Sequence, residues 1–375
     1  MSPFIVMEVL ERAKELQQQG ADVIHLEVGE PDFNVPNCVA EATTSALAAE
    51  QTHYTHSLGD IELRQAIANL YHNEYNVTVD PDCIVVTSGS SPAILLALLV
   101  LCEAGGEVIV SNPGYACYRN FILACNGVPV EVNLKAETDF QFSISDIKKA
   151  ITPKTRAIFI NSPMNPTGTL VSNNVMQQLA TLGIPILSDE IYHGLVYNGQ
   201  AHSMLEYSSN TFVFNGFSKR YAMTGLRLGY LIAPKQYIRQ LQILQQNLFI
   251  CASSLAQKAG IAAIQQAQTQ VEQMRAIYNQ RRLYMISRLR SMGFVIHTEP
   301  QGAFYIFADA RKFTTNSYQL AFDLLEKTYV GVTPGTDFGS NGEGFIRFSY
   351  ANSLENIKIA LDRIENYLKH LKKDV

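Results

Sequence analysis

The chain has 375 residues, enough for one large domain or two smaller ones with well-formed cores. It is 47% hydrophobic and carries 29 basic and 34 acidic residues, so its net charge of −5 gives no indication of a nucleic-acid partner. The longest apolar run, residues 93–102, is too short to span a bilayer, and no signal peptide is evident at the N-terminus. We therefore expect neither a membrane protein nor a secreted one.

The cysteines and histidines offer no strong ligand pattern. Six cysteines are scattered without a C-x-x-C pair, which indicates reduced thiols and a cytoplasmic location. His53 and His56 lie close together but have no acidic or cysteine neighbour, so we expect a solvated or capping role and no metal site.

The first 75 residues alternate between helical and loop signals. Apolar residues at helical spacing predict a helix over 5–19 that ends at Gly20. Residues 23–28 predict a short strand that runs into Gly29-Glu-Pro-Asp-Phe33, where glycine permits a close backbone approach, although a structural turn explains the stretch equally well. Helices are expected over 39–49 and 63–75, and Tyr54 between them reads, on its own, as a packing residue.

Residues 84–232 alternate between short apolar β-runs and helices. The β-runs cover residues 84–86, 108–110, 128–132, 157–160, 184–187, 211–214 and 228–232. Such alternation predicts an α/β fold with a mostly parallel sheet and helices on both faces.

Four polar clusters directly follow β-runs of this region. They are Ser88–Ser91, Asn161–Asn165, Asp189 and Lys219. Parallel strands end at the same edge of a sheet, and α/β sheets bind ligands beyond that edge, so we expect the clusters to form one site. The Ser/Gly turn before the helix that starts near Pro92 could bind an anion, but Ser and Pro are also ordinary capping residues.

The cluster at 215–230 has the most informative chemistry. Lys219 lies among apolar residues, and Arg227 follows eight positions later. Burial lowers the pKa of a lysine, and a neutral amine can form a Schiff base with an aldehyde, whereas an arginine fork suits a phosphate. The pair fits a cofactor that carries both groups, although either residue alone would more often be an ordinary surface side chain.

The C-terminal third predicts a second, smaller unit. Helices are expected over 235–248, 254–267, 271–292, 317–328 and 354–371, and β-like runs over 294–297, 303–308 and 345–349. Gly293 should end the longest helix, and we expect the first 25 to 30 residues to pack against this unit. The prediction is a large domain over 30–280 and a small α+β domain built from 1–29 and 281–375.

Ten motifs, in order along nearly the whole chain, resemble the class I/II aminotransferases of pyridoxal 5′-phosphate (PLP) fold type I. They are Gly29-Glu-Pro-Asp-Phe33, Tyr54 with Gly59 and Leu63-Arg64, Ser88-Gly-Ser90, Asn112-Pro-Gly-Tyr115, Asn161-Ser-Pro-Met-Asn-Pro-Thr-Gly168, Ser188-Asp-Glu-Ile-Tyr192, Ser218-Lys219 with Thr224-Gly-Leu-Arg227, Gly302-Ala-Phe-Tyr305, Pro334-Gly-Thr-Asp-Phe338 and Arg347-Phe-Ser-Tyr-Ala351. The resemblance implies transamination between an L-amino acid and a 2-oxo acid, of aspartate or broad-range type, by a ping-pong mechanism. It also implies a homodimer with shared active sites.

The same resemblance implies a role for each site residue. Lys219 would hold PLP as a Schiff base and move the substrate proton, and Asp189 would pair with the ring nitrogen. Tyr192 and Asn165 would bind the ring oxygen, Tyr115 would stack on the ring, and the phosphate would be held by Ser90, Ser91, Ser218 and Arg227. Arg347 would hold the substrate α-carboxylate, with help from Asn165 and the Gly29 backbone, and Tyr54 would reach the phosphate of the partner subunit.

Three residues depart from the pattern of many relatives. Gly216 replaces a serine, Leu226 a tryptophan and Met164 an asparagine. A phosphate contact is therefore missing at Gly216, but no group essential to transamination is lost.

Two other functions are compatible with these residues. A PLP-dependent C–S β-lyase would use the same scaffold and would release pyruvate and ammonia from cystathionine without an oxo acid. A PLP-binding regulator without turnover would need an interaction that survives Lys219→Ala. The substrate side chain is not evident from the sequence: Arg119 could bind a distal carboxylate, but a solvent-facing position on a helix is the simpler explanation.

Overall fold

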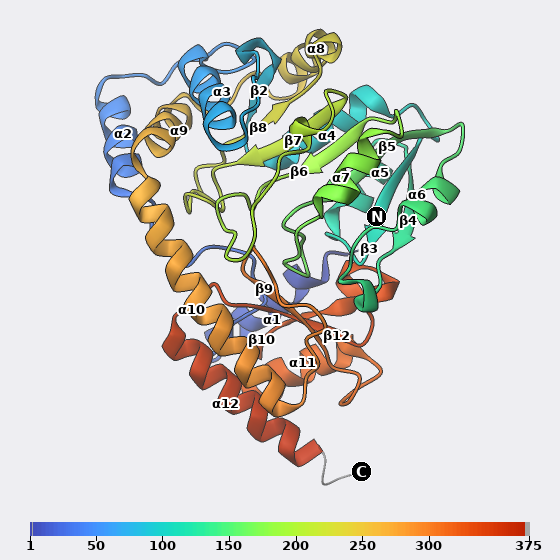
Figure 1. Ribbon diagram of the computed structural model, residues 1–375. Helices are drawn as coiled ribbons and strands as arrows, with labels where there is room; N and C mark the ends of the chain where they lie inside the picture. Colours follow the sequence, from blue (N-terminus) through green and yellow to red (C-terminus); the bar gives the residue numbers. More distant parts are fainter. Residues whose placement is uncertain (2, 372–375) are drawn as a thin grey trace.

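The computed structural model describes residues 1 and 3–371, and its largest element is a seven-stranded sheet in the upper half of Figure 1. The strands follow the order β2 (Ile84–Thr87), β8 (Gly229–Ile232), β7 (Thr211–Gly216), β6 (Ile186–Asp189), β5 (Thr155–Asn161), β3 (Glu107–Asn112) and β4 (Val128–Asn133). Only β8 is antiparallel to its neighbours, which are β2 and β7. One reversed strand leaves β2 pointing the same way as β7, so β2, β5, β6 and β7 end at one edge of the sheet. The predicted α/β fold with a mostly parallel sheet is confirmed.

Helices cover both faces of this sheet because its strands bury apolar residues on both sides. One face packs against α4 (Ser90–Leu101), α5 (Cys117–Ala124) and α8 (Ile238–Leu248). The other face packs against α2 (Asn37–Ala48), α3 (Ile61–Tyr75), α6 (Ile144–Ala150), α7 (Asn173–Ala180) and α9 (Ser254–Gln266). Successive residues of a strand point to opposite faces, as in β2, where Val85 packs on the first set and Val86 on the second.

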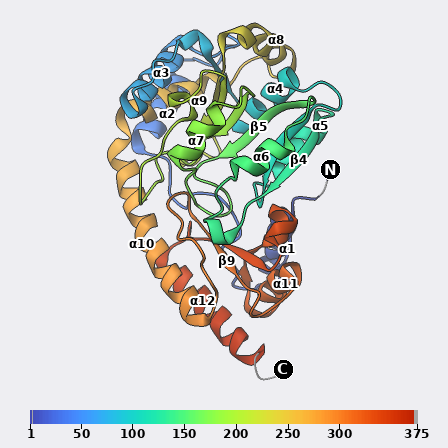
Figure 2. The same cartoon turned by 45° about the vertical axis from the view of Figure 1, so that its right-hand side comes forward.

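A smaller part of the molecule lies below the sheet in Figure 1 and combines α1 with elements from the C-terminal third of the sequence. It contains an antiparallel sheet of β11 (Thr333–Pro334), β12 (Phe345–Ser349) and β9 (Tyr305–Asp309), and a parallel pair of β1 (Ile24–His25) and β10 (Val330–Gly331). Its helices are α1 (Ile5–Gln18), α11 (Ser317–Thr328) and α12 (Leu354–Leu371). In both views α1 lies among these C-terminal elements (Figures 1 and 2), as the sequence predicted.

Helix α10 (Gln268–Met292) connects the two parts and runs down one side of the molecule (Figure 1). The predicted domain boundary at residue 280 falls inside this helix. It ends where the sequence indicated, because Gly293 has a φ of +106° and donates its N–H to the carbonyls of Leu289 and Arg290. Along the part of the chain that the structure describes, every helix is too short or too polar to cross a bilayer.

Two predicted strands are shorter in the structure. The run at 23–28 pairs only as β1, because its partner β10 has two residues. The run at 294–297 forms a single bridge between Val295 and Asp309. A strand needs a neighbour of matching length, which local sequence does not specify.

Candidate active site

A cavity of about 320 Å³ lies at the carboxyl edge of the large sheet, where it meets α1 and β12. Of the residues predicted for the site, all but Tyr54 line this cavity: Gly29, Ser90, Ser91, Tyr115, Asn165, Asp189, Tyr192, Ser218, Lys219, Arg227 and Arg347. The strand order explains this, since β2, β5, β6 and β7 carry polar residues just where they end.

Lys219 is placed in the turn after β7 and points into the cavity. Its Nζ donates a hydrogen bond of 2.6 Å to the Gly29 carbonyl. Burial lowers the pKa of Lys219 to about 8, and the charges of Arg227 and Arg347 act in the same direction, against Glu30 and Asp189. The neutral fraction of the amine near neutral pH is therefore larger than that of an exposed lysine, and the neutral amine is the nucleophile.

Asp189 ends β6 and is buried at the floor of the cavity. The Tyr118 hydroxyl donates to Asp189 Oδ2 over 2.7 Å, and the Ile191 N–H donates to Oδ1 over 3.1 Å. Burial raises the pKa of Asp189 to about 6, and these two hydrogen bonds and the charge of Lys219 limit the rise. The carboxylate can thus accept a proton or stabilise a cationic group above it.

An anion site is formed at the start of α4. Gly89 precedes the helix with a φ of +91°, and a Cβ built there would lie 2.5 Å from Arg227 Nη2. A Cβ at Gly229 would lie 2.6 Å from the Ser90 nitrogen, so two glycines let the turn, β8 and the arginine meet. Among the described residues Arg227 forms no ion pair with a carboxylate; its Nη1 donates to the Thr224 carbonyl over 2.9 Å. Free helix N–H groups, serine hydroxyls and this guanidinium suit a phosphate.

Arg347, in β12, is buried and also lines the cavity. Its Nη1 donates to Asn165 Oδ1 over 2.9 Å and its Nη2 to Thr333 Oγ1 over 3.1 Å, while its Nε has no partner among the described residues. The rings of Tyr305 and Phe338 hold the guanidinium at 4.3 and 4.9 Å. A buried guanidinium with an unused donor is a ready partner for a substrate carboxylate.

Tyrosines form the remaining walls. The hydroxyls of Tyr192 and Tyr305 lie 2.9 Å apart, and a Cβ at Gly29 would lie 2.0 Å from the Tyr305 hydroxyl. Tyr115 meets Tyr118 edge to face at 5.2 Å. Gly29 therefore has no room for a side chain, which explains the glycine of its motif.

Tyr54 is the predicted site residue that does not line the cavity. It is 80% exposed and lies outside the cavity of its own chain. Gly216, which replaces a serine of many relatives, is tightly packed: a Cβ there would lie 3.0 Å from the Leu228 carbonyl and 3.1 Å from Gly229 Cα.

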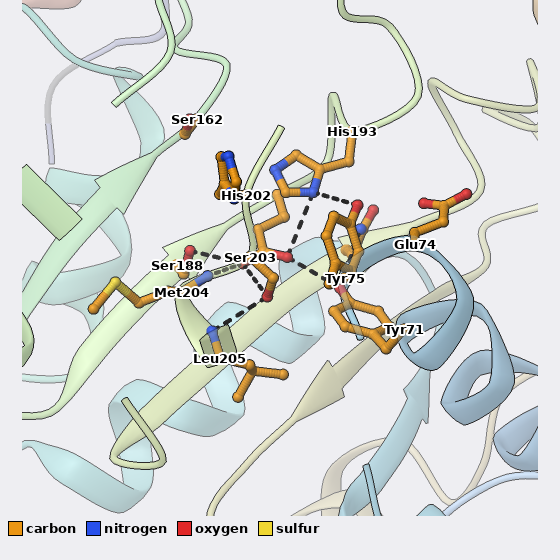
Figure 3. Close-up of polar contacts among 12 residues, drawn as sticks. Tyr71, Glu74, Tyr75, Ser162, Ser188, His193, His202, Ser203, Met204 and Leu205 are labelled. Atoms are coloured by element: carbon orange, nitrogen blue, oxygen red, sulfur yellow. Dashed lines mark hydrogen bonds and ion pairs between the residues drawn. The ribbon is translucent and has the colours of Figure 1, made fainter. Parts of the chain in front are cut away.

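Glu190, directly after Asp189, is buried in a polar network outside the cavity (Figure 3). Its carboxylate accepts hydrogen bonds from the Ser188, Ser203 and Tyr71 hydroxyls and from the Met204 N–H, at 3.0 to 3.1 Å. Burial raises the pKa of Glu190 to about 7 and lowers that of His193, 3.6 Å away, to about 3. This network fixes the chain that carries Asp189 and Tyr192.

Tyr118, Tyr305 and the residues of α1 that line the cavity were not predicted from the sequence to be site residues. Tyr118 lies three positions after Tyr115 in the same helical region, and Tyr305 belongs to a quoted motif, so both had a weak signal. The residues of α1 had none, because their contact with the cavity joins segments that are far apart in sequence.

The residues of the cavity fit PLP. Arg347 Nε has no partner among the described residues, and Gly89 leaves room for a group beside Arg227, so the cavity can hold two anionic groups. Lys219 and Asp189 line the same cavity. The fold and this set of side chains are those of a PLP-dependent enzyme of fold type I.

The chain belongs to the family of class I and II aminotransferases, whose sequence profile matches residues 21–364. It is 40% identical to the (5-formylfuran-3-yl)methyl phosphate transaminase of Methanocaldococcus jannaschii, over 97% of this chain and 96% of that one. It is 36% identical to an aspartate aminotransferase of Pyrococcus horikoshii, over 97% and 94% of the two chains. A solved structure of a Thermus thermophilus aspartate aminotransferase double mutant superposes with a TM-score of 0.93 at 36% identity, over 98% and 97% of the chains.

Proposed function

We propose that this transaminase holds PLP as a Schiff base on Lys219 and moves the amino group of an L-amino acid to a 2-oxo acid in two alternating half-reactions. The observation that carries the proposal is the convergence of Lys219, Asp189, Arg227 and Arg347 on one cavity. The relatives named above are an aspartate aminotransferase and a (5-formylfuran-3-yl)methyl phosphate transaminase, so the same amino-group transfer is combined with different substrates among them.

Different side chains of the cavity bind different parts of the cofactor. When bound, PLP supplies an electron sink that stabilises negative charge at the substrate Cα. Arg227, Ser90, Ser91 and Ser218 hold the phosphate, and Asp189 keeps a proton on the ring nitrogen. Tyr192 and Asn165 bind the ring oxygen, and Tyr115 covers a face of the ring.

Lys219 and Arg347 act on the substrate. Arg347 binds the α-carboxylate with the help of its Nε, which has no partner among the described residues, and Asn165 and the Gly29 backbone lie beside it. Lys219, whose pKa is lowered to about 8, would take the proton from the substrate Cα and deliver it to C4′ of the cofactor. Amino acid and oxo acid share the same carboxylate site, so they bind in turn, as ping-pong kinetics requires.

We further propose a homodimer in which Tyr54 completes the phosphate site of the partner. The exposure of Tyr54 in a single chain supports this assignment. We also infer that residues 30–280 and the pair 1–29 and 281–375 behave as two domains around the cavity. The six unpaired cysteines favour a cytoplasmic enzyme.

The test is a borohydride reduction of the purified holoenzyme followed by peptide mapping. We expect the trapped cofactor on the peptide that contains Lys219. We also expect L-amino acids to shift the spectrum to the pyridoxamine form and 2-oxo acids to reverse the shift. A cofactor trapped on another peptide, or pyruvate and ammonia released from cystathionine without an oxo acid, would contradict the proposal.

A further inference from the structure

One wall of the active-site cavity is apolar and comes from the first residues of the chain. Phe4, Val6, Met7 and Leu10 line the cavity from the start of α1, and we call them the α1 wall. Phe4 meets the ring of Tyr115 edge to face at 6.0 Å, so the wall continues into the region assigned to the cofactor ring.

The charged residues of the cavity already have partners or assigned tasks. The cations among its described lining residues are Lys219, Arg227 and Arg347. All three are used in the proposed function, by the cofactor aldehyde, the phosphate and the α-carboxylate. Glu30 adds a negative charge and accepts a hydrogen bond from the Thr224 hydroxyl. The lining residues thus leave no cation for a second substrate carboxylate.

Arg119, which the sequence offered for that purpose, points elsewhere. It pairs with Glu131, its side chain is 48% exposed, and it lines a different hollow on the far side of Tyr115 and Tyr118. Within a single chain, a distal carboxylate would therefore face the apolar α1 wall and no unused cation.

Asp337 fixes the α1 wall in place. The Ile5 N–H donates to Asp337 Oδ1 over 2.8 Å and the Val6 N–H to Oδ2 over 3.4 Å, so a residue more than 330 positions away caps the first turn of α1. Phe4, the helix's own N-cap residue, makes no such bond. The next residue, Phe338, packs on Arg347. Asp337 and Phe338 therefore set the position of the wall relative to the carboxylate-binding arginine.

From this arrangement we infer that the preferred amino-acid substrate has a large uncharged side chain, aliphatic or aromatic, which packs on the α1 wall. Asp337 is a positioning residue for that wall. The inference rests on the proposed function, because it takes Arg347 as the site of the α-carboxylate. Apolar side chains gain free energy on leaving water, whereas a carboxylate without a partner loses it.

The first experiment compares substrates in single turnovers of the PLP-loaded enzyme. We expect the rate constant divided by the apparent dissociation constant to be about 100-fold higher for phenylalanine and leucine than for aspartate, a difference of about 2.7 kcal/mol. Equilibrium titration with unreactive acids gives a second readout: 3-phenylpropionate should bind at least about 10-fold more tightly than succinate. A preference for aspartate, or tighter binding of succinate, would overturn the inference. If no amino acid reacted, the proposed function would fail, and the binding comparison would still decide the nature of the wall.

Substitutions in the wall provide the second experiment. Met7 is 45% exposed, so Met7→Arg should fold, and it adds a cation at the cavity. We expect turnover of aspartate to rise about 10-fold and that of phenylalanine to fall by a similar factor. Gln17→Arg adds the same charge on the exposed side of α1 and should change neither. Equal effects of the two variants would contradict the assignment of the wall.

Asp337→Asn tests the positioning role. The variant weakens the cap, so we expect KM for phenylalanine to rise about 5-fold to 10-fold while kcat and the KM for alanine stay within about 2-fold. Alanine is the internal control because its methyl group is too short to depend on the wall. An equal rise of KM for both substrates would show that Asp337 supports the fold without setting specificity.

Discussion

The Tyr118 hydroxyl donates a hydrogen bond of 2.7 Å to Asp189 Oδ2, linking α5 to the end of β6 beneath the active-site cavity. The ring of Tyr118 stacks on Phe159 with centroids 3.9 Å apart, so its position does not depend on the hydroxyl. The hydroxyl can therefore be removed without moving the ring.

We predict that Tyr118→Phe weakens PLP binding chiefly at low pH. Burial raises the pKa of Asp189 to about 6, and the Tyr118 hydroxyl opposes that rise, so its loss raises the pKa further. The carboxylate then becomes neutral at a higher pH. The apparent Kd for PLP, measured by fluorescence titration, should increase about 10-fold at pH 6.5 and by less at pH 8.5. Tyr318→Phe, on the surface of α11, serves as the control. If the Kd for PLP at pH 6.5 were the same in Tyr118→Phe as in the native enzyme, the role of Tyr118 would be refuted.

For Arg347→Lys we expect a loss of substrate binding with the cofactor retained. Lysine keeps the charge but cannot form the planar two-pronged contact, which should raise KM for amino acids about 100-fold, or about 2.7 kcal/mol. PLP affinity should stay within about 2-fold. Arg290→Lys, at an exposed ion pair with Glu299, is the matched control. Equal KM values for Arg347→Lys and the native enzyme would place the carboxylate site elsewhere.

The Glu190 and His193 pair predicts opposite pH effects on stability. Burial raises the pKa of Glu190 from 4.5 to about 7, so the folded state binds a proton that the unfolded state releases, and stability falls as pH rises through this range. Burial lowers the pKa of His193 from 6.5 to about 3, so stability rises with pH over that range. Between pH 4.5 and 6.5 the two slopes, each about 1.4 kcal/mol per pH unit, oppose each other.

Single substitutions should separate the pH dependence of stability that Glu190 contributes from the one that His193 contributes. Arg220 and Tyr75 also face the pair and remain in both variants, so the comparison isolates the two titrating groups. In Glu190→Gln the free energy of unfolding, measured in denaturant, should rise with pH between 4.5 and 6.5 relative to the native protein. In His193→Asn it should fall. Parallel curves for both variants would show that neither group titrates as its environment indicates.

Mixed dimers test the shared active site. Lys219→Ala removes the amine and Tyr54→Ala removes the proposed contact with the partner, so each homodimer should be impaired at both sites. A hybrid of the two variants has one site with both changes and one with neither. We expect the hybrid to recover up to about half of the native activity per dimer, measured after separation of differently tagged subunits. If the hybrid gains nothing over the parent variants, Tyr54 acts within its own chain.

The sequence by itself determined the α/β sheet and the set of residues at its edge. Asp189 and Lys219 each follow a continuous apolar run, and a strand buried on both faces needs such a run, so local pattern was enough to place them at strand ends. The ordered motifs then indicated the family, which the sequence profile confirms.

Tertiary structure alone decided the contacts between distant segments. The reversed direction of β8, the cap that Asp337 gives to α1 and the outward turn of Arg119 toward Glu131 each join residues whose local sequences carry no mark of the partner. Such contacts depend on how whole elements pack, because burial and hydrogen bonding are satisfied only once the surfaces meet. The sequence therefore indicated the chemistry of this enzyme, whereas the fold set the shape and polarity of the wall that we expect to select its substrates.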